Sequence, residues 1–254
     1  MSNKTKPKKA YKNLDFLRSD YARTIRILSE YLEPESRLKK NKVNNTVLFF
    51  GSARVNSDDE SAPLYKYYRQ AEELAYLLAE WAIDLKPRGK NFVICTGGGG
   101  GIMEAANRGA NRAGGKSIGM NISLPHEQEP NQFISPELAF EFHYFFMRKF
   151  WLVNKARAIV AFPGGFGTLD EIFETLTLIQ TGKINRKEIL ILLYGEEYWE
   201  KIINFQRLVE NKTISPGDLS LFAYSSDPKE AFVTLKERLI KYLHINERGT
   251  ERGE

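Results

Sequence analysis

The sequence contains few residues of the kinds that crosslink proteins or bind metals. Its 254 residues include one cysteine, Cys95, and three histidines. A single cysteine excludes an intrachain disulfide, and the apolar run around Cys95 is typical of a buried thiol in a reducing compartment. His126 and His143 have no partner at metal-ligand spacing, so we expect neither a metal site nor a cofactor.

Long hydrophobic runs are also missing. A membrane-spanning helix needs about 20 consecutive apolar residues, and a secretory signal needs an apolar stretch soon after its positive residues. The sequence has neither feature. We therefore expect a cytoplasmic protein with no membrane partner.

The net charge of +5 is concentrated at the start of the chain. Residues 1–14 hold no acid and these lysines: Lys4, Lys6, Lys8, Lys9 and Lys12. Because this stretch has few apolar side chains to bury, we predict a disordered basic leader over residues 1–14. The rest of the chain has no net bias toward polyanions, which predicts no nucleic-acid partner.

No linker rich in proline, glycine or serine divides residues 15–254, so we expect a single nucleotide-binding domain there. Its first element is predicted to be a helix from Asp15 to Glu33, ended by Pro34. Apolar residues recur there at intervals of three or four, as on one face of a helix: Leu17, Tyr21, Ile25, Leu28 and Leu32.

Apolar runs and helical patterns then alternate along the chain. The predicted strands are 46–50, 92–96, 116–122, 140–144, 158–162 and 188–194. The predicted helices are 63–85, 101–113, 146–156, 168–181, 196–209 and 228–244, with an ordered loop at 124–138. Strands that are apolar throughout are buried on both faces, as in a parallel sheet covered by helices. We predict an α/β fold: a Rossmann-like doubly wound parallel sheet with an N-terminal helical extension.

The first of two glycine-rich turns runs from Gly97 to Gly101, between a predicted strand and a predicted helix. Glycine lets the backbone approach a phosphate closely, and a helix start offers unpaired N–H groups. Tight packing of strand against helix also favours glycine, but five in succession exceed that need. We therefore expect Gly98 and Gly99 to contact the phosphate or ribose of a ligand.

The second turn, PGGFGT, again links a predicted strand to a predicted helix. Pro163 restricts the chain as it leaves the strand, and the glycines keep side chains out of the way. Thr168 is at the expected N-cap position, where its hydroxyl can cap the helix or bind a phosphate oxygen. Thr168 and Glu171 also match a capping box, so spacing alone leaves capping and catalysis equally open for Glu171.

Both turns lack features of other nucleotide sites. Neither contains GKS or GKT, which excludes a P-loop for a triphosphate. No acid follows the first turn at the distance and position that an NAD site requires. A nucleoside monophosphate is the ligand that remains.

Together these motifs resemble the Lonely Guy family of cytokinin riboside 5′-monophosphate phosphoribohydrolases, many of which were mislabelled lysine decarboxylases. The family's PGGxGTxxE motif is matched from Pro163 to Glu171, and its upstream arginine by Arg148. The runs FFGSAR, GGGGGIMEAANRGA and LPHEQEPN are similar to further loops of the family. No constellation of residues supports a Schiff-base lysine for pyridoxal phosphate, so we do not expect a decarboxylase.

The resemblance implies a hydrolase that releases the base from AMP or an N6-substituted AMP, with Arg148 and Glu171 as the catalytic pair. It implies that the substrate is bound by Gly164, Gly165, Phe166, Gly167, Thr168, Lys149, Glu127 and Thr177. It also implies a homodimer or a higher homo-oligomer.

Two other classes of protein remain open. A non-catalytic carrier of a nucleotide or cofactor would use the same glycine turns, similar to molybdenum-cofactor carrier proteins. A nucleic-acid-binding protein would depend on the basic leader. Release of free base from AMP distinguishes the hydrolase from both.

Overall fold

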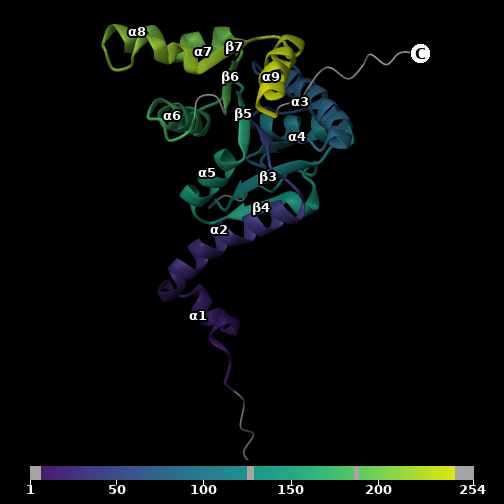
Figure 1. Ribbon diagram of the computed structural model, residues 1–254, viewed down its shortest axis with the longest axis vertical. Coiled ribbons are helices and arrows are strands. Elements are labelled where there is room, and N and C mark those ends of the chain that lie inside the picture. Colours follow the sequence, from purple (N-terminus) through teal and green to yellow (C-terminus); the bar gives the residue numbers. More distant parts are fainter. Residues whose placement is uncertain (1–6, 125–128, 186–188, 244–254) are drawn as a thin grey trace, which may run out of the picture.

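The computed structural model describes residues 7–124, 129–185 and 189–243, and its centre is one parallel sheet (Figure 1). Within the described residues the strand order is β4-β3-β2-β1-β5-β6-β7, with every neighbouring pair parallel. The strands are β1 Thr46–Phe50, β2 Val93–Thr96, β3 Ser117–Ile122, β4 Ala139–Phe142, β5 Ala156–Ala161, β6 Leu190–Tyr194 and β7 Phe222–Ser225. The predicted Rossmann-like doubly wound sheet is confirmed.

Helices cover both faces of the sheet. One core lies under α3 Tyr65–Leu85, α4 Ile102–Arg112 and α9 Pro228–Leu243. The other lies under α5 Phe145–Asn154, α6 Phe166–Gln180, α7 Glu196–Ile202 and α8 Phe205–Glu210. In β1, Val47 and Phe49 face the first core, whereas Leu48 and Phe50 face the second. Burial on both faces is why this strand reads as continuously apolar.

Short 3-10 helices complete the described elements: η1 Ala10–Lys12, η2 Asp20–Ala22, η3 Lys86–Arg88, η4 Pro136–Leu138 and η5 Pro216–Leu221. Cys95 is buried in the second core, as expected, and burial raises the pKa of its thiol to about 12. No helix within the described ranges has the length and apolar content that a bilayer crossing requires.

The N-terminal extension differs from its prediction. The expected single helix is divided at Ser19 into α1 Leu14–Arg18 and α2 Arg23–Lys40. Pro34 does not end the second helix but lies inside it, buried. In Figure 1 α2 runs past β4 and carries α1 away from the sheet. Of the predicted leader, residues 1–6 lie outside the described chain, and residues 10–12 form the exposed turn η1.

Two predictions near the C-terminal end were wrong. The expected helix 196–209 is interrupted at Ile203 and Asn204, where the Asn204 side chain accepts a hydrogen bond from Arg207 N and caps α8. Strand β7 was missed, because it has only four residues and a mixed pattern of burial at the edge of the sheet.

Candidate active site

The site lies where the strand order changes direction. Strands β2 to β4 lie on one side of β1, and β5 to β7 lie on the other. Loops that leave neighbouring strands in opposite directions at such a switch point form the usual ligand crevice of an open α/β sheet. Here the loop after β1 contacts both glycine turns: Ser52 N donates to Pro163 O at 3.0 Å, and Ile102 N donates to Ser52 O at 3.0 Å.

The first glycine turn is held by a buried network of polar side chains. Thr96 Oγ1 accepts from Gly98 N at 2.9 Å and donates to Asn107 Oδ1 at 2.7 Å. Asn131 Nδ2 donates to three oxygens, which are Gly98 O, Gly99 O and Asn107 Oδ1. Because each of these groups has a partner, the network fixes the path of the turn.

The sequence analysis did not identify this network. Asn107 and Asn131 belong to runs that were recognised as motifs, but both act through contacts between distant segments. Gly98 has a φ of +81°, and a β-carbon there would collide with the side chain of Asn121. Gly98 therefore has a structural reason to be glycine, whatever it binds.

The second turn opens helix α6, but not at the predicted residue. Helix α6 begins at Phe166 with Gly165 as its N-cap, and no side chain caps it. The N-cap role predicted for Thr168 was therefore wrong, because Thr168 is already the third helical residue. Its side chain is 6% exposed and lies against the α-carbon of Gly164. The first N–H groups of α6 have no intrahelical acceptor, which is the usual basis of an anion site.

Two glycines of this turn have no steric requirement from the chain itself. A β-carbon at Gly165 or Gly167 would have no neighbour within 4 Å. Gly164 is different, because a β-carbon there would meet Thr168. Tyr198 further fixes this residue by donating its hydroxyl hydrogen to Gly164 O at 2.9 Å. The open space at Gly165 and Gly167 is what close approach of a ligand to the helix start requires.

Glu171 is the buried acid of the site. As the sixth residue of α6 it lies beyond the capping positions, so the capping alternative was wrong. Its side chain is 6% exposed, and its Oε2 is buried without a hydrogen-bond partner among the described residues. Burial raises the pKa of Glu171 to about 7, against the lowering effect of the positive charges of Arg148 and Lys149. A buried carboxyl with a pKa near neutrality is typical of a catalytic acid or base.

Arg148 reaches the same region from α5. Its Nε donates to Met120 O at 2.7 Å, and its guanidinium lies against the α-carbon of Gly97. Burial lowers the pKa of this guanidinium, whereas the negative charge of Glu171 raises it. The two groups thus interact electrostatically, but among the described ion pairs none joins them. The predicted pair therefore lies close enough for each charge to act on the other.

The other predicted residues are arranged differently. Lys149 forms ion pairs with Asp170 and Glu174, each at 2.9 Å, and so lies beside Glu171. Phe166 is 93% exposed at the start of α6. Thr177 is exposed and donates to Phe173 O, and its position on α6 turns it away from the side of Glu171. Glu127 lies outside the described residues.

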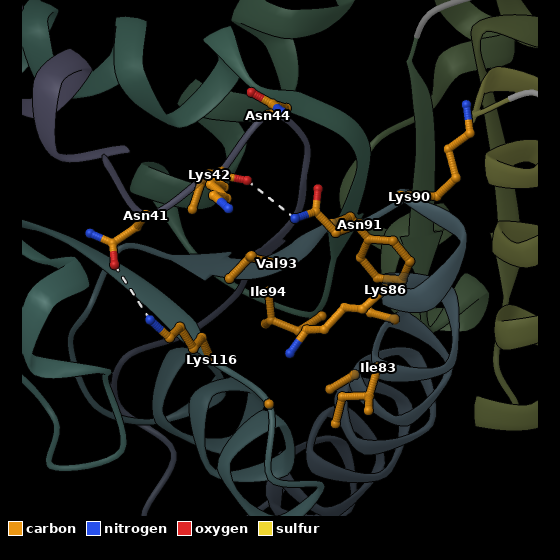
Figure 2. Close-up of a pocket in the computed structure, with 16 residues that line it drawn as sticks. Asn41, Lys42, Asn44, Ile83, Lys86, Lys90, Asn91, Val93, Ile94 and Lys116 are labelled. Carbon is orange, nitrogen blue, oxygen red and sulfur yellow. Dashed lines mark hydrogen bonds between the residues drawn. The ribbon is translucent and has the colours of Figure 1, made fainter. Parts of the chain in front are cut away.

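A separate cavity lies at the opposite ends of the strands from the glycine turns (Figure 2). It encloses about 500 Å³ beside the start of β2 and is lined by Lys42, Lys86, Lys90 and Lys116 among others. In Figure 2 the Lys90 side chain points away from the other labelled residues. Helices α2 and α3 end here, and lysines at helix C-termini complement the helix dipole. The cavity shares no lining residue with the glycine turns.

No group of three or more potential metal-ligating side chains occurs among the described residues. A protein family described as possible lysine decarboxylase matches residues 103–235, which include α6, nearly all of α4, Arg148 and Glu171.

The chain belongs to this family. Curated relatives in the Lonely Guy family include a probable cytokinin riboside 5′-monophosphate phosphoribohydrolase of Oryza sativa subsp. japonica. It is 26% identical over 209 residues, covering 81% of this chain and 82% of the relative. A cytokinin riboside 5′-monophosphate phosphoribohydrolase of Arabidopsis thaliana is 26% identical over 201 residues, covering 78% and 83%.

Solved structures share the fold of this Lonely Guy family member. The structural genomics target TM1055 has a TM-score of 0.53 at 21% identity, covering 76% of this chain and 99% of the other. A molybdenum-cofactor carrier protein from Chlamydomonas reinhardtii has a TM-score of 0.51 at 20% identity, covering 78% and 99%. At these identities the likeness concerns the fold alone.

Proposed function

We propose that the protein hydrolyses the N-glycosidic bond of a nucleoside 5′-monophosphate. The substrate is AMP or an N6-substituted AMP, and the products are the free base and ribose 5-phosphate. One observation carries the proposal: Glu171 is buried on α6, the helix that the PGGFGT turn opens, with its Oε2 unpaired among the described residues and its charge influenced by Arg148. The names of the curated relatives support the same reaction.

The phosphate binds at the start of α6. The unpaired N–H groups of Phe166, Gly167 and Thr168 and the positive end of the helix dipole stabilise its charge. Open space at Gly165 and Gly167 allows the phosphate oxygens to approach the backbone. The phosphate thereby fixes the ribose at a set distance from Glu171, which lies about a turn and a half further along the helix.

Cleavage breaks the bond between ribose C1′ and the base nitrogen while water supplies the new oxygen on C1′. The sugar develops positive charge as the bond breaks, and the Glu171 carboxylate stabilises that charge or orients the water. The base leaves with extra electron density on its nitrogens. Arg148 is a planar donor with a permanent charge and suits that end of the bond.

The decisive experiment incubates the purified protein with AMP and with N6-substituted AMP and identifies released bases by mass. Glu171→Gln is expected to abolish base release while binding of ribose 5-phosphate persists, because the α6 turn is unchanged. Glu237→Gln removes an exposed acid from α9 and is the matched control, expected to retain full activity.

Retained turnover in Glu171→Gln would refute the assignment of Glu171. Tight nucleotide binding without any turnover by the wild type would favour a non-catalytic carrier instead. That alternative has no better support, since the likeness to a carrier protein concerns the fold alone. The cytoplasmic location, the homo-oligomer, the absence of a nucleic-acid partner and the single nucleotide-binding domain over residues 15–254 stay predictions.

A further inference from the structure

Glu30 of the N-terminal extension bonds to the start of α5. Its Oε1 accepts from His143 N at 2.8 Å, and its Oε2 accepts from Tyr144 N at 3.2 Å. Helix α5 begins at Phe145, and its N-cap, Tyr144, provides no capping side chain. A carboxylate from a different helix therefore supplies the cap. Its negative charge also complements the positive end of the α5 dipole.

The backbone of Glu30 makes a second bond to α5. In a regular helix Glu30 O would accept from the N–H of residue 34, but Pro34 has none. The indole Nε1 of Trp151 donates to Glu30 O instead, at 3.0 Å. Trp151 is 3% exposed, so this bond is made inside the protein. Pro34 thus leaves free the carbonyl that binds α5.

The two bonds from Glu30 reach α5 on either side of Arg148 in the chain. Arg148 lies between Tyr144 and Trp151 in the chain and belongs to the first turn of α5. Its backbone N donates to Tyr144 O at 3.1 Å. Next to Glu30 on α2, Tyr31 packs its ring against Phe150 and Trp151, with centroid distances of 5.6 and 5.7 Å. The extension thus contacts α5 on both sides of Arg148.

We propose that Glu30 is a positioning residue that holds the first turn of α5, and with it Arg148, in the geometry needed for cleavage. The inference rests on the proposed function for its kinetic consequence. It gives the extension a role in the reaction, although α2 lies outside residues 103–235 that match the family. Helix α2 contacts α5, and in Figure 1 it lies next to β4.

Glutamine at position 30 keeps one acceptor oxygen but presents an NH2 group to the other amide. One amide at the start of α5 therefore loses its acceptor, the negative charge is lost, and the first turn frays. Fraying displaces Arg148 but not Glu171 or the phosphate-binding turn, which belong to α6. The kinetic effect therefore falls on kcat, where stabilisation of the leaving base counts. The affinity for ribose 5-phosphate stays unchanged, because that ligand has no base.

The test compares Glu30→Gln with Glu35→Gln, which makes the same charge change at an exposed position of the same helix. For Glu30→Gln we expect kcat to fall about tenfold with little change in KM, as loss of a helix cap and its charge predicts. Glu35→Gln is expected to behave as the wild type. In an Arg148→Ala background Glu30→Gln should cause no further loss, because the two changes act through one group.

Hydrogen exchange measured by mass spectrometry tests whether Glu30 holds the start of α5, and it does not rely on turnover. In Glu30→Gln the amides of residues 143–148 should exchange faster than in the wild type, while those of α6 stay unchanged. Trp151→Phe removes the indole donor, together with part of the buried ring, and should produce a smaller change of the same kind. The exchange measurement can be made on Trp151→Phe if Glu30→Gln does not fold.

Unchanged exchange at residues 143–148 in both variants would overturn the proposal. A loss of kcat that adds fully to that of Arg148→Ala would also overturn it, since Glu30 would then act independently of the arginine. If the wild type releases no base, the proposed function fails by itself. The exchange experiment still decides in that case whether Glu30 holds the start of α5.

Discussion

The guanidinium of Arg148 lies against the α-carbon of Gly97, in the space that a β-carbon would fill in any other residue. The sulfur of Met103 borders the same space, at 2.8 Å from the position of that β-carbon. Gly97 therefore has a steric reason to be glycine, because the Arg148 side chain from another helix lies over it. The first glycine turn thus borders the guanidinium of Arg148.

Gly97→Ala is expected to displace Arg148 and to reduce kcat by at least about tenfold, as the loss of a well-placed charged group predicts. The change in KM should be small, because the phosphate site on α6 does not involve Gly97. Steady-state kinetics with AMP measures both values. Gly217→Ala is the control, since a β-carbon there has no neighbour within 4 Å. Equal kcat in the two variants would contradict the predicted displacement.

Gly167→Ala should separate stability from binding. Gly167 is in the first turn of α6 with open space around it, so alanine is expected to stabilise the fold by up to about 1 kcal/mol. The added methyl group enters the space where the phosphate approaches, so affinity for ribose 5-phosphate should fall. Denaturant unfolding and calorimetry measure the two effects. Unchanged affinity for ribose 5-phosphate would mean that the phosphate does not bind at this turn.

Glu171→Gln should alter stability in a pH-dependent way. Burial holds the folded-state pKa of Glu171 at about 7, above the ordinary value of 4.5. Proton binding at Glu171 therefore contributes stability that is fully present below pH 4.5 and is lost as the pH rises through about 7. Above that range the variant should be more stable than the wild type by up to about 3 kcal/mol. Chemical denaturation across this pH range measures the difference, and equal stability at all pH values would contradict the buried carboxyl.

Lys149→Gln should change the pH dependence of the reaction. The positive charge of Lys149 lowers the pKa of Glu171, and its loss also leaves Asp170 and Glu174 unneutralised beside that carboxyl. Since cleavage requires the ionised form, the wild-type kcat/KM should rise through about pH 7, and the variant's rise should occur at higher pH. Lys229→Gln, at an exposed position of α9, should leave the profile unchanged. A shift to lower pH would refute the electrostatic role of Lys149.

Asn131→Asp should lower the stability of the fold more than Asn131→Ala, although aspartate has the shape of asparagine. The Nδ2 group donates to three oxygens, and a carboxylate would oppose all of them with negative charge. Thermal unfolding compares the two variants. The control is Asn56→Asp, whose exposed Oδ1 accepts from Asp58 N, an interaction that a carboxylate preserves. The reverse order of stability would mean that Asn131 does not donate as described.

Local sequence patterns predicted the elements of the fold that are buried uniformly along their length. Apolar runs such as 46–50 and 190–194 are buried on both faces, so their composition identifies them as central strands. Prediction failed at Pro34, where the helix continues. The indole N–H of the distant Trp151 donates to Glu30 O in place of the N–H that proline lacks. Prediction failed also at the short edge strand β7, where no continuous apolar run exists.

The candidate site was predicted in part. The glycine turns, Arg148 and Glu171 were identified from motifs. In the structure Arg148 lies against Gly97, and its charge acts on that of Glu171. Spacing left Glu171 undecided between capping and catalysis, because the outcome depends on the residue at which α6 begins. Asn131 and Glu30 were missed, since each acts on a segment distant in the chain.

The sequence by itself determined the parallel α/β sheet, the two glycine turns and the chemical types of the candidate site residues, because these depend on local composition and short spacings. Only the tertiary structure decided that Glu171 is buried, that Arg148 lies over Gly97, and that Glu30 caps α5. Burial and pKa depend on the atoms that surround a group in space. Those atoms come from α2, β3, α5 and α6, segments whose contacts no local pattern records.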